Sequence, residues 1–137
     1  MSETKCVLIV NESMPLGVVA NTAAVLSASL GKLRPEMIGA DLPDSEGHLH
    51  QGITTMAIPI LKGNGPLLKK MRAQLKEFEP GLLVVDLIDA TRTTKSYEEY
   101  AAVLRKTPPG EIEYLGLALF GEKKVVTSLT GNLGLLR

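Results

Sequence analysis

An acid, a guanidinium and a hydroxyl stand close together in the middle of this chain, at Asp89, Arg92 and Thr93. A carboxylate beside a hydroxyl can orient water or a substrate hydroxyl, and a guanidinium can bind an oxyanion. Asp and Thr also form structural turns by bonding to nearby backbone groups, so that interpretation stays open. We treat Asp89 and Thr93 as candidate catalytic residues and Arg92 as a candidate ligand-binding residue.

The segment before these residues indicates why they belong to a site. Residues 82–87 are aliphatic at every position but one, which is typical of a strand that is buried on both faces. Ligands of open α/β sheets bind outside the carboxyl ends of the strands. The sequence therefore predicts that Asp89, Arg92 and Thr93 lie at the ligand-binding edge of a sheet.

A second group of candidate binding residues follows the first predicted strand, residues 5–10. Asn11 lies at its carboxyl end, and Gly17 lies at the start of a predicted helix, where free backbone amides can bind an anion. Asn21 lies one turn further along, among small and apolar residues, so we expect a buried amide that binds a ligand or ties the helix to the turn. Asn11, Gly17 and Asn21 are predicted ligand-binding residues that share one solvent-open hollow with the loop after residues 82–87.

Hydrophobic patterning and turn residues predict alternating strands and helices along the chain. The expected elements are strand 5–10, helix 16–30 capped by Gly31, strand 37–42, a strand within 48–61, a helix that starts at Pro66 and ends before Pro80, strand 82–87, a helix from the capping box at Ser96 to Lys106, strand 114–120 and helix 122–130. Residues 43–47 suggest a hairpin turn, and Pro59 suggests a sheet edge. This order predicts one α/β domain over residues 1–137, a three-layer α/β/α sandwich.

Composition narrows the function classes. The chain has 15 Lys and Arg against 15 Asp and Glu, so nothing attracts it globally to nucleic acid or to an acidic membrane. A cluster of basic residues is expected to be a solvated helix face; it comprises Lys69, Lys70, Arg72 and Lys76. Cys6 cannot form an internal disulfide, and no apolar run is expected to reach the length of a signal sequence or membrane span. We therefore expect a cytoplasmic protein without a membrane partner.

Other site chemistry has weaker support. His48 and His50, at strand spacing near three acids, are compatible with a metal site, but two histidines beside a turn are usually polar surface. Neither a phosphate-binding nor a dinucleotide-binding glycine pattern occurs, so we expect no nucleotide cofactor and no metal. Cys6 lies in an apolar strand without an activating neighbour in sequence, which disfavours a cysteine nucleophile.

Two segments resemble known proteins. Residues 89–93, Asp-Ala-Thr-Arg-Thr, are similar to the Asp-Ala-Gly-Arg-Thr motif of class II peptidyl-tRNA hydrolases, and residues 126–136 are similar to their closing segment. Nearly the whole chain resembles the domain of unknown function 2000 family. That match depends on Asn21, Gly31-Lys32, Gly47 and Gly52-Ile53, Tyr97 and Tyr100, and the Leu-Thr-Gly ending. The resemblance implies the hydrolase-like fold, with a mixed sheet between helices, and a homodimer.

The first helix departs from the hydrolase pattern. Aligned on Gly17, Val18 and Val25 stand where those hydrolases carry a lysine and a histidine, and Thr91 replaces the glycine of their motif. Valine can neither donate to a phosphate nor transfer a proton. We therefore expect a protein that binds an unknown small molecule or anion, or hydrolyses it, at the carboxyl edge of the sheet. The alternative is a peptidyl-tRNA hydrolase or tRNA-binding protein.

Overall fold

The aliphatic runs of the sequence pair into one mixed sheet in the computed structural model, which describes residues 3–137. The strands are β1 (Thr4–Asn11), β4 (Ile60–Gly63), β5 (Leu83–Ile88) and β6 (Tyr114–Glu122). Their order is β4-β1-β6-β5; β1 is parallel to β4, and β6 is antiparallel to both β1 and β5. The carboxyl ends of β1, β4 and β5 therefore meet at the same edge of the sheet.

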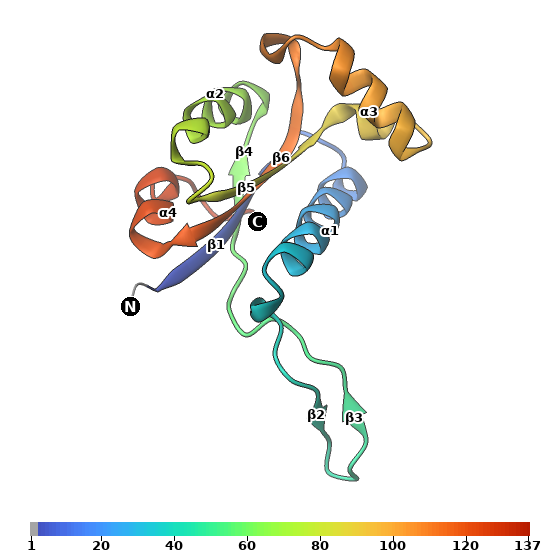
Figure 1. Ribbon diagram of the computed structural model, residues 1–137, viewed down its shortest axis with the longest axis vertical. Coiled ribbons are helices and arrows are strands. Elements are labelled where there is room, and N and C mark those ends of the chain that lie inside the picture. Colours follow the sequence, from blue (N-terminus) through green and yellow to red (C-terminus); the bar gives the residue numbers. More distant parts are fainter. Residues whose placement is uncertain (1–2) are drawn as a thin grey trace.

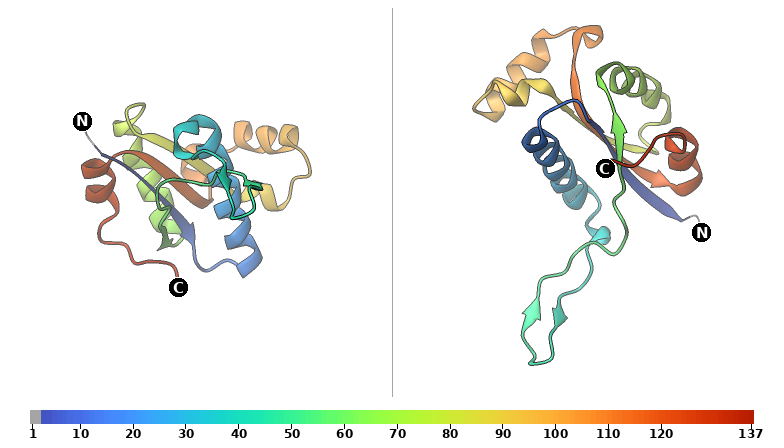
Figure 2. Two further views of the ribbon diagram at one scale, coloured as in Figure 1. Left: turned by 90° about the horizontal axis from the view of Figure 1, so that it is seen from below. Right: turned by 180° about the vertical axis from the view of Figure 1, so that it is seen from behind.

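Helices lie on both faces of this sheet (Figures 1 and 2). They are α1 (Leu16–Leu33), α2 (Gly65–Leu75), α3 (Tyr97–Lys106) and α4 (Lys123–Thr130). Alternate residues of β1 enter two cores: Cys6 and Leu8 pack under α1, whereas Val7 and Ile9 pack with α2 and α4. The helix α3 lies beyond the carboxyl end of β5 (Figure 1).

Local sequence signals set most helix boundaries. Asn64 caps α2 by accepting from the Leu67 amide, and the Ser96 hydroxyl caps α3 by accepting from the Glu99 amide at 3.1 Å, as the capping box predicted. Gly31 was expected to end the first helix, but it does not. The helix continues through it to Leu33, because nothing near Gly31 requires a left-handed backbone.

Residues 38–55 form a hairpin, here called the arm, that projects away from the sheet (Figure 1). Its strands β2 (Leu42–Pro43) and β3 (Leu49–His50) have two residues each. The expected hairpin is confirmed, but the expected strand over 37–42 is wrong. Pro35–Met37 is a 3₁₀ turn, and the residues that follow leave the sheet, so they have no neighbouring strand to pair with.

Two glycines shape the arm. Gly47 has a φ of +83°, which an L side chain rarely adopts, and it completes a turn in which the Asp44 carboxylate accepts from the amides of Glu46 and His48. At the base of the arm the two branches run so close that a Cβ on Gly52 would collide with the Gly39 carbonyl oxygen. These positions explain why glycine stands there.

The edge strand β4 is covered by the end of the chain. The Leu136 amide donates to the Ile60 carbonyl and the Lys62 amide donates to the Gly134 carbonyl, each at 2.8 Å. Pro59 immediately precedes β4, in agreement with the expected sheet edge. The apolar tail thus pairs the free side of β4.

The helix α1 shows an unusual division between its two sides. Only Val19, Thr22, Leu26 and Leu30 are buried, on the side that faces the sheet. The opposite side, here called the outer face of α1, is exposed and consists of Gly17, Ala20, Asn21, Ala24 and Ala28. By length and composition α1 would suffice to cross a membrane, so the expectation that no segment reaches that length is wrong.

Gly116 of β6 allows α1 to approach the sheet, and its replacement tests this contact. A Cβ there would lie 2.6 Å from the Thr22 Cγ2 atom and 3.0 Å from the Ile9 carbonyl oxygen. We expect Gly116→Ala to lower the free energy of unfolding by about 1–3 kcal/mol, measured by urea denaturation, because the packed helix must shift.

Gly110→Ala is the matched control, since a Cβ at that glycine meets nothing within 4 Å. Its stability should stay close to that of the parent. A Gly116→Ala variant as stable as this control would contradict the close approach of α1 to β6.

Candidate functional site

The residues predicted to form a site lie at the carboxyl edge of the sheet, but they do not share one hollow. Gly17, Asn21 and Arg92 line the cavity described below, whereas Asn11, Asp89 and Thr93 do not. Asn11 is buried, and its side-chain oxygen accepts from the Ser13 amide at 3.0 Å, so it shapes the turn between β1 and α1. Asp89 is exposed and begins a 3₁₀ turn, Asp89–Arg92. The Thr93 hydroxyl donates to the Ala90 carbonyl at 3.3 Å, the local bond that a structural turn would make.

The start of α1 and the turn after β5 meet around a cavity of about 300 Å³. It is lined by Gly17, Val18, Asn21, Thr91, Arg92 and Leu115. Asn21 is exposed rather than buried, which corrects the expectation from the sequence. The buried polar residue of this turn is its neighbour Thr22, whose hydroxyl donates to the Val18 carbonyl at 2.8 Å.

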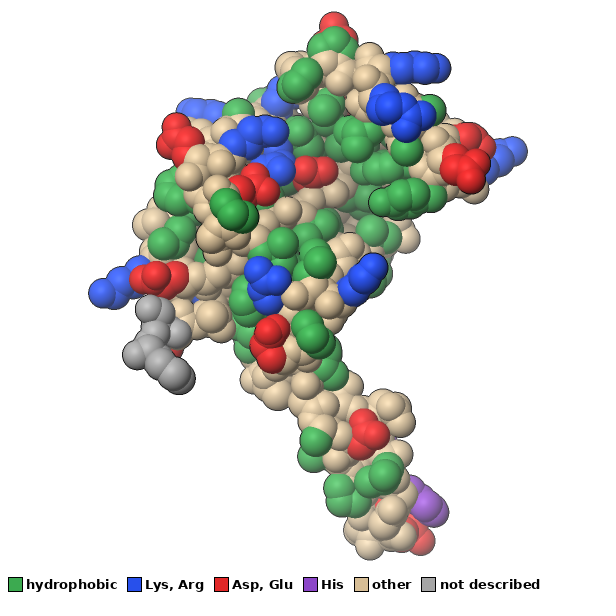
Figure 3. Space-filling view, viewed as in Figure 1, with side chains coloured by type: hydrophobic (Ala, Val, Ile, Leu, Met, Phe, Trp, Pro, Cys, Tyr) green, Lys and Arg blue, Asp and Glu red, His purple; other side chains and the backbone are tan. Residues whose placement is uncertain are grey.

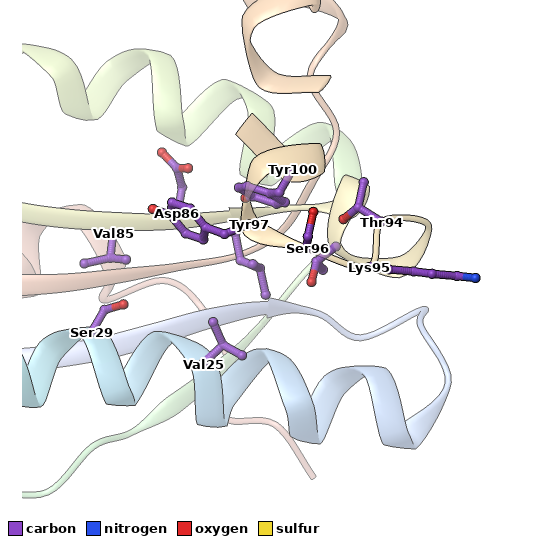
Figure 4. A pocket seen from close by; sticks show the side chains of 11 residues that line it. Val25, Ser29, Val85, Asp86, Thr94, Lys95, Ser96, Tyr97 and Tyr100 are labelled. Carbon is purple, nitrogen blue, oxygen red and sulfur yellow. The ribbon is translucent and has the colours of Figure 1, made fainter. Parts of the chain in front are cut away.

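A larger cavity of about 500 Å³ lies between α1, β5 and the start of α3 (Figure 4). It is lined by Val25 and Ser29 of α1, by Val85, Asp86 and Leu87 of β5, and by Thr91, Thr94, Lys95, Ser96, Tyr97 and Tyr100. Val25 and Ser29 point across it toward β5, whereas the Asp86 carboxylate and the Lys95 ammonium point away (Figure 4). Thr91 lines both cavities, and we call the two together the α1–α3 groove.

Tyr97 and Tyr100 form one wall of this groove. Their rings stack with centroids 6.4 Å apart, and the Ile88 amide donates to the Tyr100 hydroxyl at 3.0 Å. Burial raises the pKa of Tyr100, so its hydroxyl stays neutral at physiological pH. Tyr97 is 86% exposed and presents an uncovered aromatic ring at the mouth of the groove.

Sequence reasoning missed an ion-pair cluster on the other face of the sheet. The Arg72 guanidinium donates to Asp86 and to Glu79, both at 2.8 Å, and its side chain is only 13% exposed. Burial alone would lower the pKa of Arg72, but these two carboxylates raise it. The expected solvated face is thus wrong for Arg72. Asp86 could have indicated this cluster in the sequence, because a single charged residue within an aliphatic strand needs a partner of opposite charge.

The two histidines lie in the arm, away from the α1–α3 groove. His50 Nε2 lies 3.0 Å from an Asp44 carboxylate oxygen, and this hydrogen bond lowers the pKa of Asp44. Within residues 3–137 no three His, Cys, Asp or Glu side chains are grouped to hold a metal ion. Burial raises the pKa of the Cys6 thiol, which keeps it unreactive.

A family model for proteins of unknown function, DUF2000, matches residues 4–137. The chain belongs to the DUF2000 family. A solved structure, that of the protein of unknown function Atu0240 from Agrobacterium tumefaciens strain C58, superposes with a TM-score of 0.90 at 20% identity, over 100% of both chains. This likeness shows a shared fold. No curated protein matches the chain.

Several of the residues on which the resemblance to the DUF2000 family is based lie in two places in the structure. Asn21, Tyr97 and Tyr100 line the α1–α3 groove. Gly47 and Gly52 shape the arm. Gly31, Lys32 and the Leu-Thr-Gly ending lie elsewhere, at the C-terminal ends of α1 and α4.

Removing the Tyr100 hydroxyl tests how the groove wall is held. In Tyr100→Phe the Ile88 amide loses its acceptor, and an unpaired buried amide costs about 1–3 kcal/mol of unfolding free energy. Urea denaturation should show this loss, whereas Tyr97→Phe, with its exposed ring, should stay within about 0.5 kcal/mol of the parent. Equal losses in both variants would contradict the assigned bond.

Acid should loosen the turn of the arm. The hydrogen bond from His50 lowers the pKa of Asp44 below its ordinary value, so the ionised carboxylate stabilises the turn above that ordinary value, about 3.9. This stabilisation is lost as the pH falls through the lower pKa of the folded arm. NMR titration of the Glu46 and His48 amides should show the transition, and Asp44→Asn should abolish it.

Proposed function

We propose that this DUF2000 protein binds a small organic anion with an apolar body in the α1–α3 groove, without hydrolysing it. The observation that carries the proposal is the groove itself, in which an apolar floor, hydroxyl groups and an exposed aromatic ring lead to an arginine at one end. Residues 17–29 of α1 run along it for roughly 18 Å, which is enough for a drug-sized molecule.

Arg92 would hold the anionic end. Its guanidinium has one hydrogen bond, to the Met14 sulfur at 3.5 Å, and within residues 3–137 it forms no salt bridge. Gly17 lies in the first turn of α1, where amides lack helical acceptors and the helix dipole favours negative charge. The Asn21 side chain can add a donor from the same cavity.

The larger cavity would hold the apolar body. Val25 and Val85 approach it from opposite sides, and the ring of Tyr97 offers a stacking surface at its mouth (Figure 4). Polar substituents of the ligand would meet the hydroxyls of Ser29 and Ser96. The lining combines aliphatic side chains with hydroxyl groups, which suits a ligand with an apolar body and polar substituents.

The resemblance to class II peptidyl-tRNA hydrolases supports binding more than hydrolysis. We include in the proposal that the helices and sheet form the three-layer α/β/α sandwich of those enzymes. On that basis Val18 and Val25, which replace their lysine and histidine, both line the groove. The wall that would carry proton transfer is then aliphatic, and the cavity suits an apolar ligand.

Paired probes of the same shape test the proposal. We expect 2-naphthoate to bind the parent more tightly than neutral 2-naphthalenemethanol, as measured by NMR titration. Arg92→Ala should weaken naphthoate binding roughly 10- to 100-fold, the loss of a charge-assisted hydrogen bond, and should leave the neutral probe unaffected. Val25→Glu should weaken both probes, because it places a charge in the apolar cavity.

Lys70→Ala is the matched control, since Lys70 is an exposed cation on α2, across the sheet from the groove. It should not alter binding of either probe. A parent protein that binds neither probe, or an Arg92→Ala variant that binds naphthoate as the parent does, would refute the proposed site.

A further inference from the structure

The outer face of α1 lacks the charged residues that a solvent-facing helix normally carries. Surface helices place charged side chains opposite their buried stripe. Here that side carries Gly17, Ala20, Asn21, Ala24 and Ala28, and Lys32 is the first charged residue of the helix. Small side chains such as these let a second helix approach closely.

The arm also presents apolar side chains to solvent. Leu42, Leu49 and Ile53 are 61%, 66% and 75% exposed. An isolated two-stranded hairpin is marginally stable in water. The Gly39 and Thr55 amides, which donate to the Ile53 and Met37 carbonyls, hold the base of the arm, and the short β2–β3 pair and the turn at Asp44 hold the rest. The structure thus has two unpartnered surfaces, which adjoin at the C-terminal end of α1 (Figure 1).

We propose that a second copy of this chain covers both surfaces, with the two α1 helices packed antiparallel about a two-fold axis near Ala24. The small residues are arranged symmetrically around that position, with Ala20 and Ala28 one turn away and Gly17 and Gly31 two turns away. In an antiparallel pair each small residue therefore faces another. A two-fold axis requires such a self-complementary surface.

The available area requires the arm as well as the helix. A helix of this length offers a strip of roughly 27 Å by 10 Å, about a third of the 800 Å² that each partner buries in a standard interface. Antiparallel packing sends each arm, which leaves the C-terminal end of α1, past the N-terminal end of the partner's helix. The exposed leucines of the arm would supply the missing apolar area there.

Charge favours this occupant over a membrane or a nucleic acid. The arm carries Asp41, Asp44 and Glu46, and no Lys or Arg occurs between residues 35 and 61 (Figure 3). An acidic arm is repelled by phosphates. Arg92, by contrast, borders the N-terminal end of α1, where the partner's arm would pass, and Lys95 follows on the same loop. Because Gly17, Asn21 and Arg92 also line the α1–α3 groove, the partner's arm and an anion bound there would compete for Arg92.

Sedimentation velocity of the full chain, from low micromolar to near-millimolar concentrations, tests the contact. We expect the parent to dimerise and Ala24→Glu to dissociate roughly 100-fold more readily, because two carboxylates then meet at the axis. Ala73→Glu is the matched control: Ala73 is likewise exposed in a helix interior, on α2, and its substitution should leave the dimer intact. Leu49→Ser should weaken the dimer about tenfold if the arm is buried in it.

Cross-linking gives a readout that does not depend on the stability of the variant. Oxidised Ala24→Cys should form a covalent dimer and Ala73→Cys should not, and the buried Cys6 thiol should not interfere. A parent that is monomeric at every concentration, or a dimer that survives Ala24→Glu, would overturn the proposal. A monomeric parent that binds phosphatidylglycerol vesicles would instead assign the outer face of α1 to lipid. Leu49→Ser with unchanged affinity would also overturn the proposal, because the contact requires the apolar area of the arm.

Discussion

The pairing of β1 with β6 is the constraint on which the rest of the structure depends. Every residue of β6 from Tyr114 to Gly121 is buried, and β1 is buried from Cys6 onward, so the two strands supply both cores at once. Because β6 runs against its neighbours, β1 and β5 end at the same edge although a strand separates them. The groove exists because α1 and α3 both follow strands that end there.

Patterns that depend on local geometry predicted the structure well. The aliphatic run at residues 82–87 is a sheet strand, and Ser96 caps α3, because both signals lie within a few consecutive residues. The side of α1 that faces outward could not be predicted in the same way. Its outer face is made of alanine and glycine and its inner face of valine and leucine, so the hydrophobic period is too weak to separate Asn21 from its buried neighbour Thr22.

Long-range contacts explain what the sequence did not predict about the site. The rule that ligands bind at the carboxyl ends of strands predicted that Gly17 and Arg92 lie together, and both line one cavity. The larger cavity joins Val25 to Tyr97, two residues of ordinary type on helices far apart in sequence, and no motif marks such a pair. Arg72 illustrates the same difficulty. It belongs to a basic cluster in the sequence, and only the three-dimensional contact with Asp86 shows that its side chain points toward the sheet.

The tail at residues 134–136 covers the edge strand β4 of the sheet. Hydrogen bonds at Leu136 and Gly134 fill the free side of β4. Displacing these residues from the sheet would uncover the Ile60 carbonyl and the Lys62 amide. Those unpaired groups would then be a template for strands from other molecules, so the tail protects this edge from intermolecular pairing.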